Sequence, residues 1–192
     1  MTVADALIAF EDICLRHVDD LRIVPSRLAD LGFSQTDVIE CNGDAAVSVL
    51  LFENPARDYA FSYILDTDGA ISSVAILVAA STHIWDAFTA FAQSQANAHD
   101  ITNESLSYLN VMPSEIAAAM VGGQFWSSKP AGQVGRNLSV TKAFFRLAGK
   151  PAYALTVDRN LALKDALDAD GWSDLTGPDS KLQEHLDLFR DV

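Results

Sequence analysis

The sequence predicts an α+β fold, in which helices pack on an antiparallel sheet built from hairpins. Apolar residues recur at steps of three and four over residues 2–21, as on one side of an amphipathic helix. Residues 59–65 and 70–78 are instead strand-like runs, joined by the short turn Asp66-Thr67-Asp68-Gly69. Strands joined by tight turns are antiparallel neighbours, so the sheet is antiparallel. The helices then bury their apolar sides by packing on this sheet. We expect one domain over residues 1–192, with about five strands.

The expected elements follow the order α-βββ-α-α-ββ-α-α. The first helix covers residues 2–21, and a short helix follows Pro25. The remaining expected elements are strands at 46–52, 59–65 and 70–78, a helix at 82–98, a short helix at 113–121, strands at 139–147 and 152–158, and helices at 158–167 and from residue 180. Residues 138–148 also suit a helix, so the second hairpin has a competing interpretation.

Composition and charge exclude several classes of function. The chain carries a net charge of −13, which repels nucleic acids and anionic membranes. Its longest apolar run, residues 74–80, is far shorter than the ~20 residues of a transmembrane helix. The first ten residues do not resemble a signal peptide, and two cysteines are too few for a disulfide framework. These features favour a cytoplasmic protein.

Basic residues are concentrated in one stretch. Residues 58–115 contain seven acidic and no basic residues, whereas residues 116–157 contain five basic and no acidic ones. The five are Lys129, Arg136, Lys142, Arg146 and Lys150. One interpretation is that they neutralise the acids of 58–115 across neighbouring strands. The other is that they form a site for an anion or for an acidic partner.

The candidate partner-binding residues are Phe125, Trp126, Lys142, Arg146 and Lys150. Phe125-Trp126 follows Gly122-Gly123, and aromatic residues of this kind are enriched in interface cores. If Lys142 and Arg146 alternate with Ala143 and Phe145 along a strand, the two bases share one face and meet a partner together.

No residue pattern predicts catalysis, a metal site or a cofactor. The four histidines lack the paired spacing of zinc ligands. Cys14 and His17 lie one helical turn apart on the apolar side of the first helix, where a buried thiol beside a core histidine is the simpler interpretation than a nucleophile pair. Asp66 and Asp68 belong to a turn and lack the remaining ligands of a calcium loop. We therefore expect a protein without enzymatic activity.

One stretch resembles a known enzyme superfamily. Gly132-Gln133-Val134-Gly135-Arg136, followed by Asn160-Leu161-Ala162 and Gly171-Trp172, is similar to the pyrophosphate loop and downstream segment of the N-acetyltransferases. The resemblance implies an anion site at Gly132, Gly135 and Arg136, which would hold acetyl-CoA at a helix N-terminus. The glycine spacing is one residue short, and Val140 and Thr141 stand where a helix former is expected.

The order of the elements is similar to that of the type III secretion chaperones, in a small acidic protein. That resemblance implies a homodimer that binds an unfolded segment of a partner, and it rests on no residue motif. The sequence thus predicts a non-enzymatic protein-interaction domain of the adaptor or secretion-chaperone kind. The alternative is an acetyl-CoA-dependent N-acetyltransferase-like enzyme.

Overall fold

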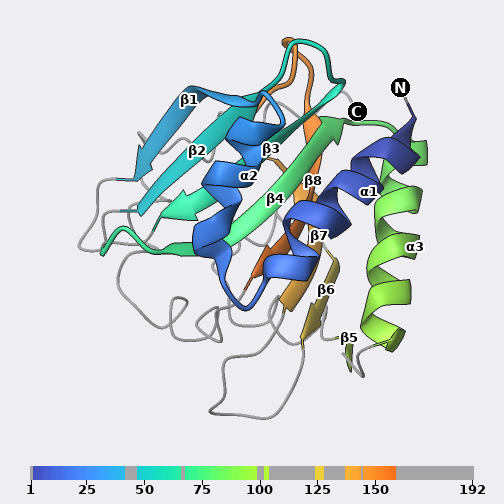
Figure 1. Ribbon diagram of the computed structural model, residues 1–192. Helices are drawn as coiled ribbons and strands as arrows, with labels where there is room; N and C mark the ends of the chain where they lie inside the picture. Colours follow the sequence, from blue (N-terminus) through green and yellow to red (C-terminus); the bar gives the residue numbers. More distant parts are fainter. Residues whose placement is uncertain are drawn as a thin grey trace, which may run out of the picture.

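A computed structural model of the chain shows an antiparallel sheet with helices on one face (Figure 1). It describes residues 2–41, 47–65, 68–98, 102–103, 124–127, 137–143 and 145–158. The helices are α1 (Val3–Ile13), the single 3₁₀ turns η1 (Leu15–His17) and η2 (Leu21–Ile23), α2 (Val24–Asp30) and α3 (Thr82–Ala98). The strands are β1 (Ser34–Cys41), β2 (Val47–Glu53), β3 (Tyr59–Leu65), β4 (Ile71–Ala79), β5 (Thr102–Asn103), β6 (Gln124–Ser127), β7 (Asn137–Lys142) and β8 (Ala152–Asp158). The α+β class is confirmed.

The sheet runs in the order β1-β2-β3-β4-β8-β7-β6-β5, and every neighbouring pair is antiparallel. Its central pairing joins distant parts of the sequence, because Ser73–Ala79 of β4 lies against Ala152–Asp158 of β8. The two expected hairpins, β3–β4 and β7–β8, are thereby neighbours in one sheet. β1, β5 and β6 are strands beyond the five expected from the sequence.

The β3–β4 hairpin agrees with its prediction. β3 covers Tyr59–Leu65, and Leu65 pairs with Ile71 across the turn. Gly69 has φ of 78°, a conformation that glycine adopts without strain, and the Asp68 carboxylate accepts a hydrogen bond of 3.0 Å from the Ala70 N–H.

The helix expected over residues 2–21 is shorter in the structure: α1 ends at Ile13 and two 3₁₀ turns follow. The Asp20 carboxylate starts the second of these turns, because it accepts the N–H of Arg22 and also pairs with its guanidinium at 2.7 Å. Val18 and Leu21 remain buried beyond the end of α1. The periodicity therefore identified the buried residues correctly and the helix length incorrectly.

A glycine closes α2 and directs the chain into β1. Gly32 has φ of 77°, and a Cβ added there would lie 3.2 Å from the Asn54 amide nitrogen. That same amide donates a 2.9 Å hydrogen bond to the Leu31 carbonyl, which ties the end of α2 to the β2–β3 connection. Phe33 then enters the core beside β3.

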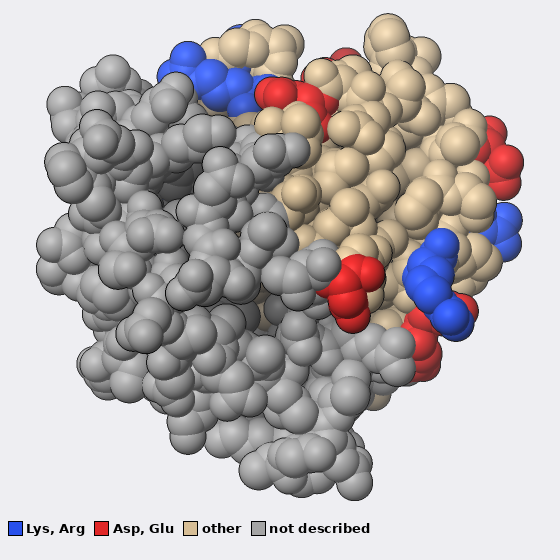
Figure 2. All heavy atoms as spheres, turned by 90° about the vertical axis from the view of Figure 1, so that its left-hand side faces the viewer, with Lys and Arg blue, Asp and Glu red and all other residues tan. Residues whose placement is uncertain are grey.

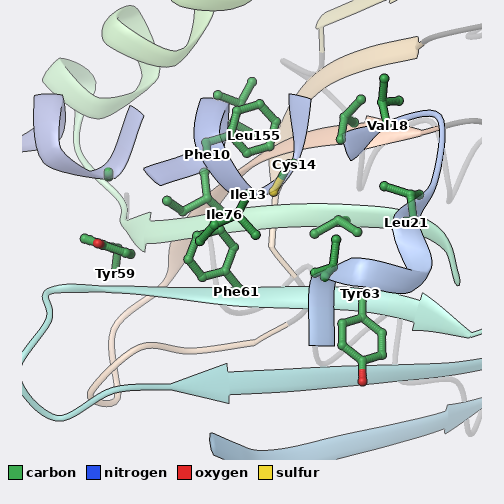
Figure 3. Close-up of a cluster of buried hydrophobic side chains, with 14 of the residues drawn as sticks. Phe10, Ile13, Cys14, Val18, Leu21, Tyr59, Phe61, Tyr63, Ile76 and Leu155 are labelled. Carbon is green, nitrogen blue, oxygen red and sulfur yellow. The ribbon is translucent and has the colours of Figure 1, made fainter. Parts of the chain in front are cut away.

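The main core lies between the helices and the sheet (Figure 3). One cross-strand row of the sheet carries Phe61, Ile76 and Leu155, all fully buried and in register on β3, β4 and β8. α1 covers this row with Phe10, Ile13 and the adjoining Cys14. Burial of this apolar area is the main force that holds the helices on the sheet.

The opposite face of the sheet carries a second, smaller buried cluster. Its strand residues are Val49, Leu51, Ala60, Ala75, Leu77, Ala152 and Ala154. Ala143, Phe145 and Leu147, from the segment that follows β7, are buried in the same cluster. The connection between β7 and β8 is therefore packed against this face.

The helices expected at 113–121, at 158–167 and from residue 180 lie outside the described residues.

Candidate functional site

The end of the β7–β8 hairpin carries two of the five basic residues, Arg146 and Lys150. Leu147 and Lys150 exchange two backbone hydrogen bonds of 2.9 Å around Ala148 and Gly149. Ala148 has φ of 49° and Gly149 of 76°, so both turn residues are left-handed, as in a type I′ turn. We call residues 145–150 the basic tip, because Arg146 and Lys150 are exposed there.

Buried neighbours fix the basic tip to the sheet. Phe145 and Leu147, on either side of Arg146, are 4% and 8% exposed. The Pro151 carbonyl accepts a 2.8 Å hydrogen bond from the Ala80 N–H, at the end of β4. The exposed cations therefore project from an anchored segment, which lowers the entropy lost when they meet a partner.

Lys142 is placed differently from the expectation that it shares a face with Arg146. β7 ends at Lys142, so Arg146 does not lie on the same strand. Lys142 pairs in register with Tyr153, whose ring contacts Trp85 of α3 at 5.0 Å between centroids. Ala143 and Phe145 are buried and Arg146 is exposed, as the alternation required. Lys142 itself is half-buried.

The structure limits the alternative in which these bases are neutralised internally. Asp68 lies in the β3–β4 turn, at the opposite end of β4 from the basic tip, and β4 itself spans about 26 Å at ~3.3 Å per residue. Among the residues that the structure describes, neither Arg146 nor Lys150 has an ion-pair partner. The described acids of 58–115 therefore form no ion pair with either base, and of these acids Asp58, directly before β3, lies at the same end of the sheet as the tip.

The remaining candidates lie apart from the tip or outside the description. Phe125 and Trp126 are in β6, opposite Ser139 and Leu138 of β7, so Phe125 is about 10 Å of strand away from the level of Lys142. Gly132, Gly135, Arg136 and Lys129 lie outside the described residues. The segment that begins at Asn137, directly after Arg136, is the strand β7, whereas the acetyltransferase resemblance implies a helix there.

The Cys14 thiol is not set up for nucleophilic chemistry. It is fully buried, and burial raises its pKa well above the ordinary value of 9.0, so the reactive thiolate is disfavoured. His17, one turn further on, is half-buried.

In the described ranges, His, Cys, Asp and Glu side chains do not gather in threes as a metal ion would require. The helices in these ranges are also too short or too polar to cross a membrane.

The outer strand β1 was not among the strands expected from the sequence. Ser34 to Val38 are exposed one after another, so the alternation that marks a half-buried strand is absent. This edge of the sheet has two exposed apolar side chains, Leu31 and Val38. It also has a bulge between Gln35 and Asp37.

Comparisons with known proteins give no identity. No protein-family model matches the chain, and neither a curated protein nor a solved structure matches it. The function is therefore inferred from the chain's own residues.

Proposed function

We propose that the protein is a non-enzymatic protein-interaction module that binds an acidic segment of a partner at its basic tip. The observation that carries this proposal is the exposure of Arg146 and Lys150 on a segment anchored by Phe145 and Leu147. Cations held in a fixed place are suited to carboxylates, because little side-chain and loop entropy remains to be lost on binding.

A short acidic protein segment suits this tip better than a nucleic acid does. The chain as a whole carries −13, and charges are screened beyond about 8–10 Å at physiological salt. A short segment can stay within that distance of the two cations. Duplex DNA carries a charge every ~1.7 Å along its axis and would extend over the acidic remainder of the protein.

The test is binding of a labelled hexaglutamate peptide, followed by fluorescence anisotropy in 50 mM NaCl. Arg146→Glu combined with Lys150→Glu should weaken binding at least about tenfold, with the melting temperature unchanged. The matched control combines Arg16→Glu with Arg27→Glu, two exposed bases on the helical side that undergo the same charge change.

Equal loss of binding in the two double variants would mean that overall charge, and not the tip, controls binding. A large fall in melting temperature confined to the tip variant would mean that the two bases are structural. Either result contradicts the proposal.

A further inference from the structure

The sheet has two unequal edges. β5 is two residues long and packs against α3, whereas β1 has eight residues and lies at the other end of the strand order. The outermost strand of a sheet leaves a row of main-chain N–H and C=O groups unpaired. Ser34 to Val38 are all exposed, so this edge is accessible in the part of β1 whose side chains are described.

Apolar side chains accompany this accessible backbone. Of the three large apolar side chains exposed in the described ranges, Leu31 precedes β1 and Val38 lies in it, at 48% and 42% exposure. Figure 2 looks onto this side of the molecule and shows a largely uncharged described surface with separate acidic and basic side chains around it. An added strand could therefore combine main-chain hydrogen bonds with apolar contacts, as in other cases of strand addition.

The charged residues of β1 and of the chain on either side of it, between Arg27 and Arg57, are all acidic. No basic residue occurs between Arg27 and Arg57, and this interval includes Asp30, Asp37 and Glu53. The Asp37 carboxylate accepts a 2.8 Å hydrogen bond from the Val38 N–H, and Glu53 accepts one of 2.8 Å from the Thr36 hydroxyl. A second copy of this chain would bring the same acids against them, whereas a basic segment would complement them.

We propose that the outer edge of β1 binds an extended basic segment of another protein as a ninth strand. A Lys or Arg side chain of that segment pairs with the Asp37 carboxylate and competes there with the hydrogen bond from the Val38 N–H. An apolar side chain of the segment covers Val38. The site is distinct from the basic tip, because β2, β3 and β4 separate β1 from β8. Asp37 thus selects the partner by charge and also covers a main-chain donor while the edge is empty.

The experiment uses the full chain with an alternating Lys-Val hexapeptide and, in parallel, the corresponding Glu-Val hexapeptide. Hydrogen exchange should slow over residues 34–41 with the Lys-Val peptide and stay unchanged with the Glu-Val peptide. Val38→Lys should weaken binding of the Lys-Val peptide at least about tenfold, because it adds a like charge to the edge. The control is Ile8→Lys on α1, which changes the net charge equally at a side chain that is 60% exposed, and it should bind like the original chain.

Three results would overturn the proposal. Equal affinities of the Val38→Lys and Ile8→Lys variants would show general attraction to an acidic chain. Slower exchange at 34–41 that depends on protein concentration without peptide would show pairing between two copies. Failure of millimolar Lys-Val peptide to slow exchange at 34–41 would show that the edge does not accept a strand. If Val38→Lys does not fold, Asp37→Asn replaces it and should reduce the preference for the Lys-Val peptide.

Discussion

Phe61 shows how much of the stability rests on single aromatic side chains. It is fully buried and meets Phe33 and Tyr59 edge to face, with centroid distances of 5.2 Å and 5.9 Å and interplanar angles of 83° and 85°. Such contacts add to the free energy gained from burying the ring itself. Because Phe33 follows α2 and Tyr59 begins β3, this cluster joins the helical layer to the sheet.

Phe61→Ala should lower the free energy of unfolding by about 3–5 kcal/mol, because it removes a buried ring and leaves a cavity. Urea denaturation measures this loss. The matched control, Ile8→Ala, changes an exposed side chain and should stay within about 0.5 kcal/mol. A loss below about 1 kcal/mol for Phe61→Ala would mean that the ring is not part of the core.

Ala148 is the described non-glycine residue with a positive φ, at 49° in the turn of the basic tip. Asparagine tolerates the left-handed conformation better than alanine, and Asn-Gly is the preferred pair for a type I′ turn. Ala148→Asn should therefore raise the free energy of unfolding by about 0.5–1 kcal/mol, seen as a higher midpoint in urea. Ala148→Val should do the reverse, and a stabilising valine would contradict the turn geometry.

At the scale of whole elements, the sequence predicted the hairpins best. The β3–β4 turn contains Asp68 and Gly69, whose chemistry specifies a tight turn locally, and the second hairpin has an Ala148-Gly149 turn. β1 was not predicted because Ser34 to Val38 are exposed, so no alternation of apolar and polar residues marks the strand. The length of α1 was wrong because the chain changes to two 3₁₀ turns after Ile13 while Val18 and Leu21 stay buried, so the apolar pattern does not record the change of helix type.

The candidate site was predictable in its composition and less so in its geometry. The cluster of bases is visible in the sequence, and so is the alternation of Phe145, Arg146 and Leu147. The separation of Lys142 from the tip follows from the end of β7, which depends on the return of the chain to β8 at Ala152. The pairing of β4 with β8, between residues far apart in sequence, cannot be obtained from local patterns.

α1 begins with a capping box that makes its stability depend on pH. The Asp5 carboxylate accepts hydrogen bonds from the Thr2 N–H at 2.8 Å and the Thr2 hydroxyl at 3.1 Å. The backbone hydrogen bond, followed by that of the hydroxyl, lowers the pKa of Asp5 below its ordinary value of 3.8. The folded state therefore binds this proton more weakly than the unfolded state does.

A lowered pKa means that the contribution of Asp5 is complete above pH 3.8 and is lost as the pH falls through the lower pKa of the folded state. Asp5→Asn should reduce stability at pH 7 and should make no difference at a pH below both pKa values. Urea denaturation of the two proteins across this range measures the difference. Unchanged spacing of the two curves at every pH would contradict a role for the charge.

For the whole molecule, the excess of acidic residues lowers the stability of the folded state through long-range repulsion. A net charge of −13 on one chain repels itself in the compact state. The described ion pairs Arg16–Asp12 and Arg22–Asp20 are exposed, and surface pairs of this kind contribute only about 0–1 kcal/mol each. Salt screens both the repulsion among the acids and the attraction within the ion pairs. The larger of the two therefore determines whether stability rises or falls with ionic strength.

Self-repulsion should dominate, because it involves all the uncompensated acids whereas the attraction comes from short-range exposed pairs. Raising NaCl from 10 mM to 200 mM at pH 7 shortens the screening length from about 30 Å to below 8 Å. We expect the melting temperature to rise by about 2–4 °C, which corresponds to roughly 1 kcal/mol for a chain of this size. Asp30→Lys combined with Asp86→Lys, two exposed positions, brings the net charge to −9 and should reduce the rise. A melting temperature that falls with salt would mean that attractive pairs outweigh the repulsion.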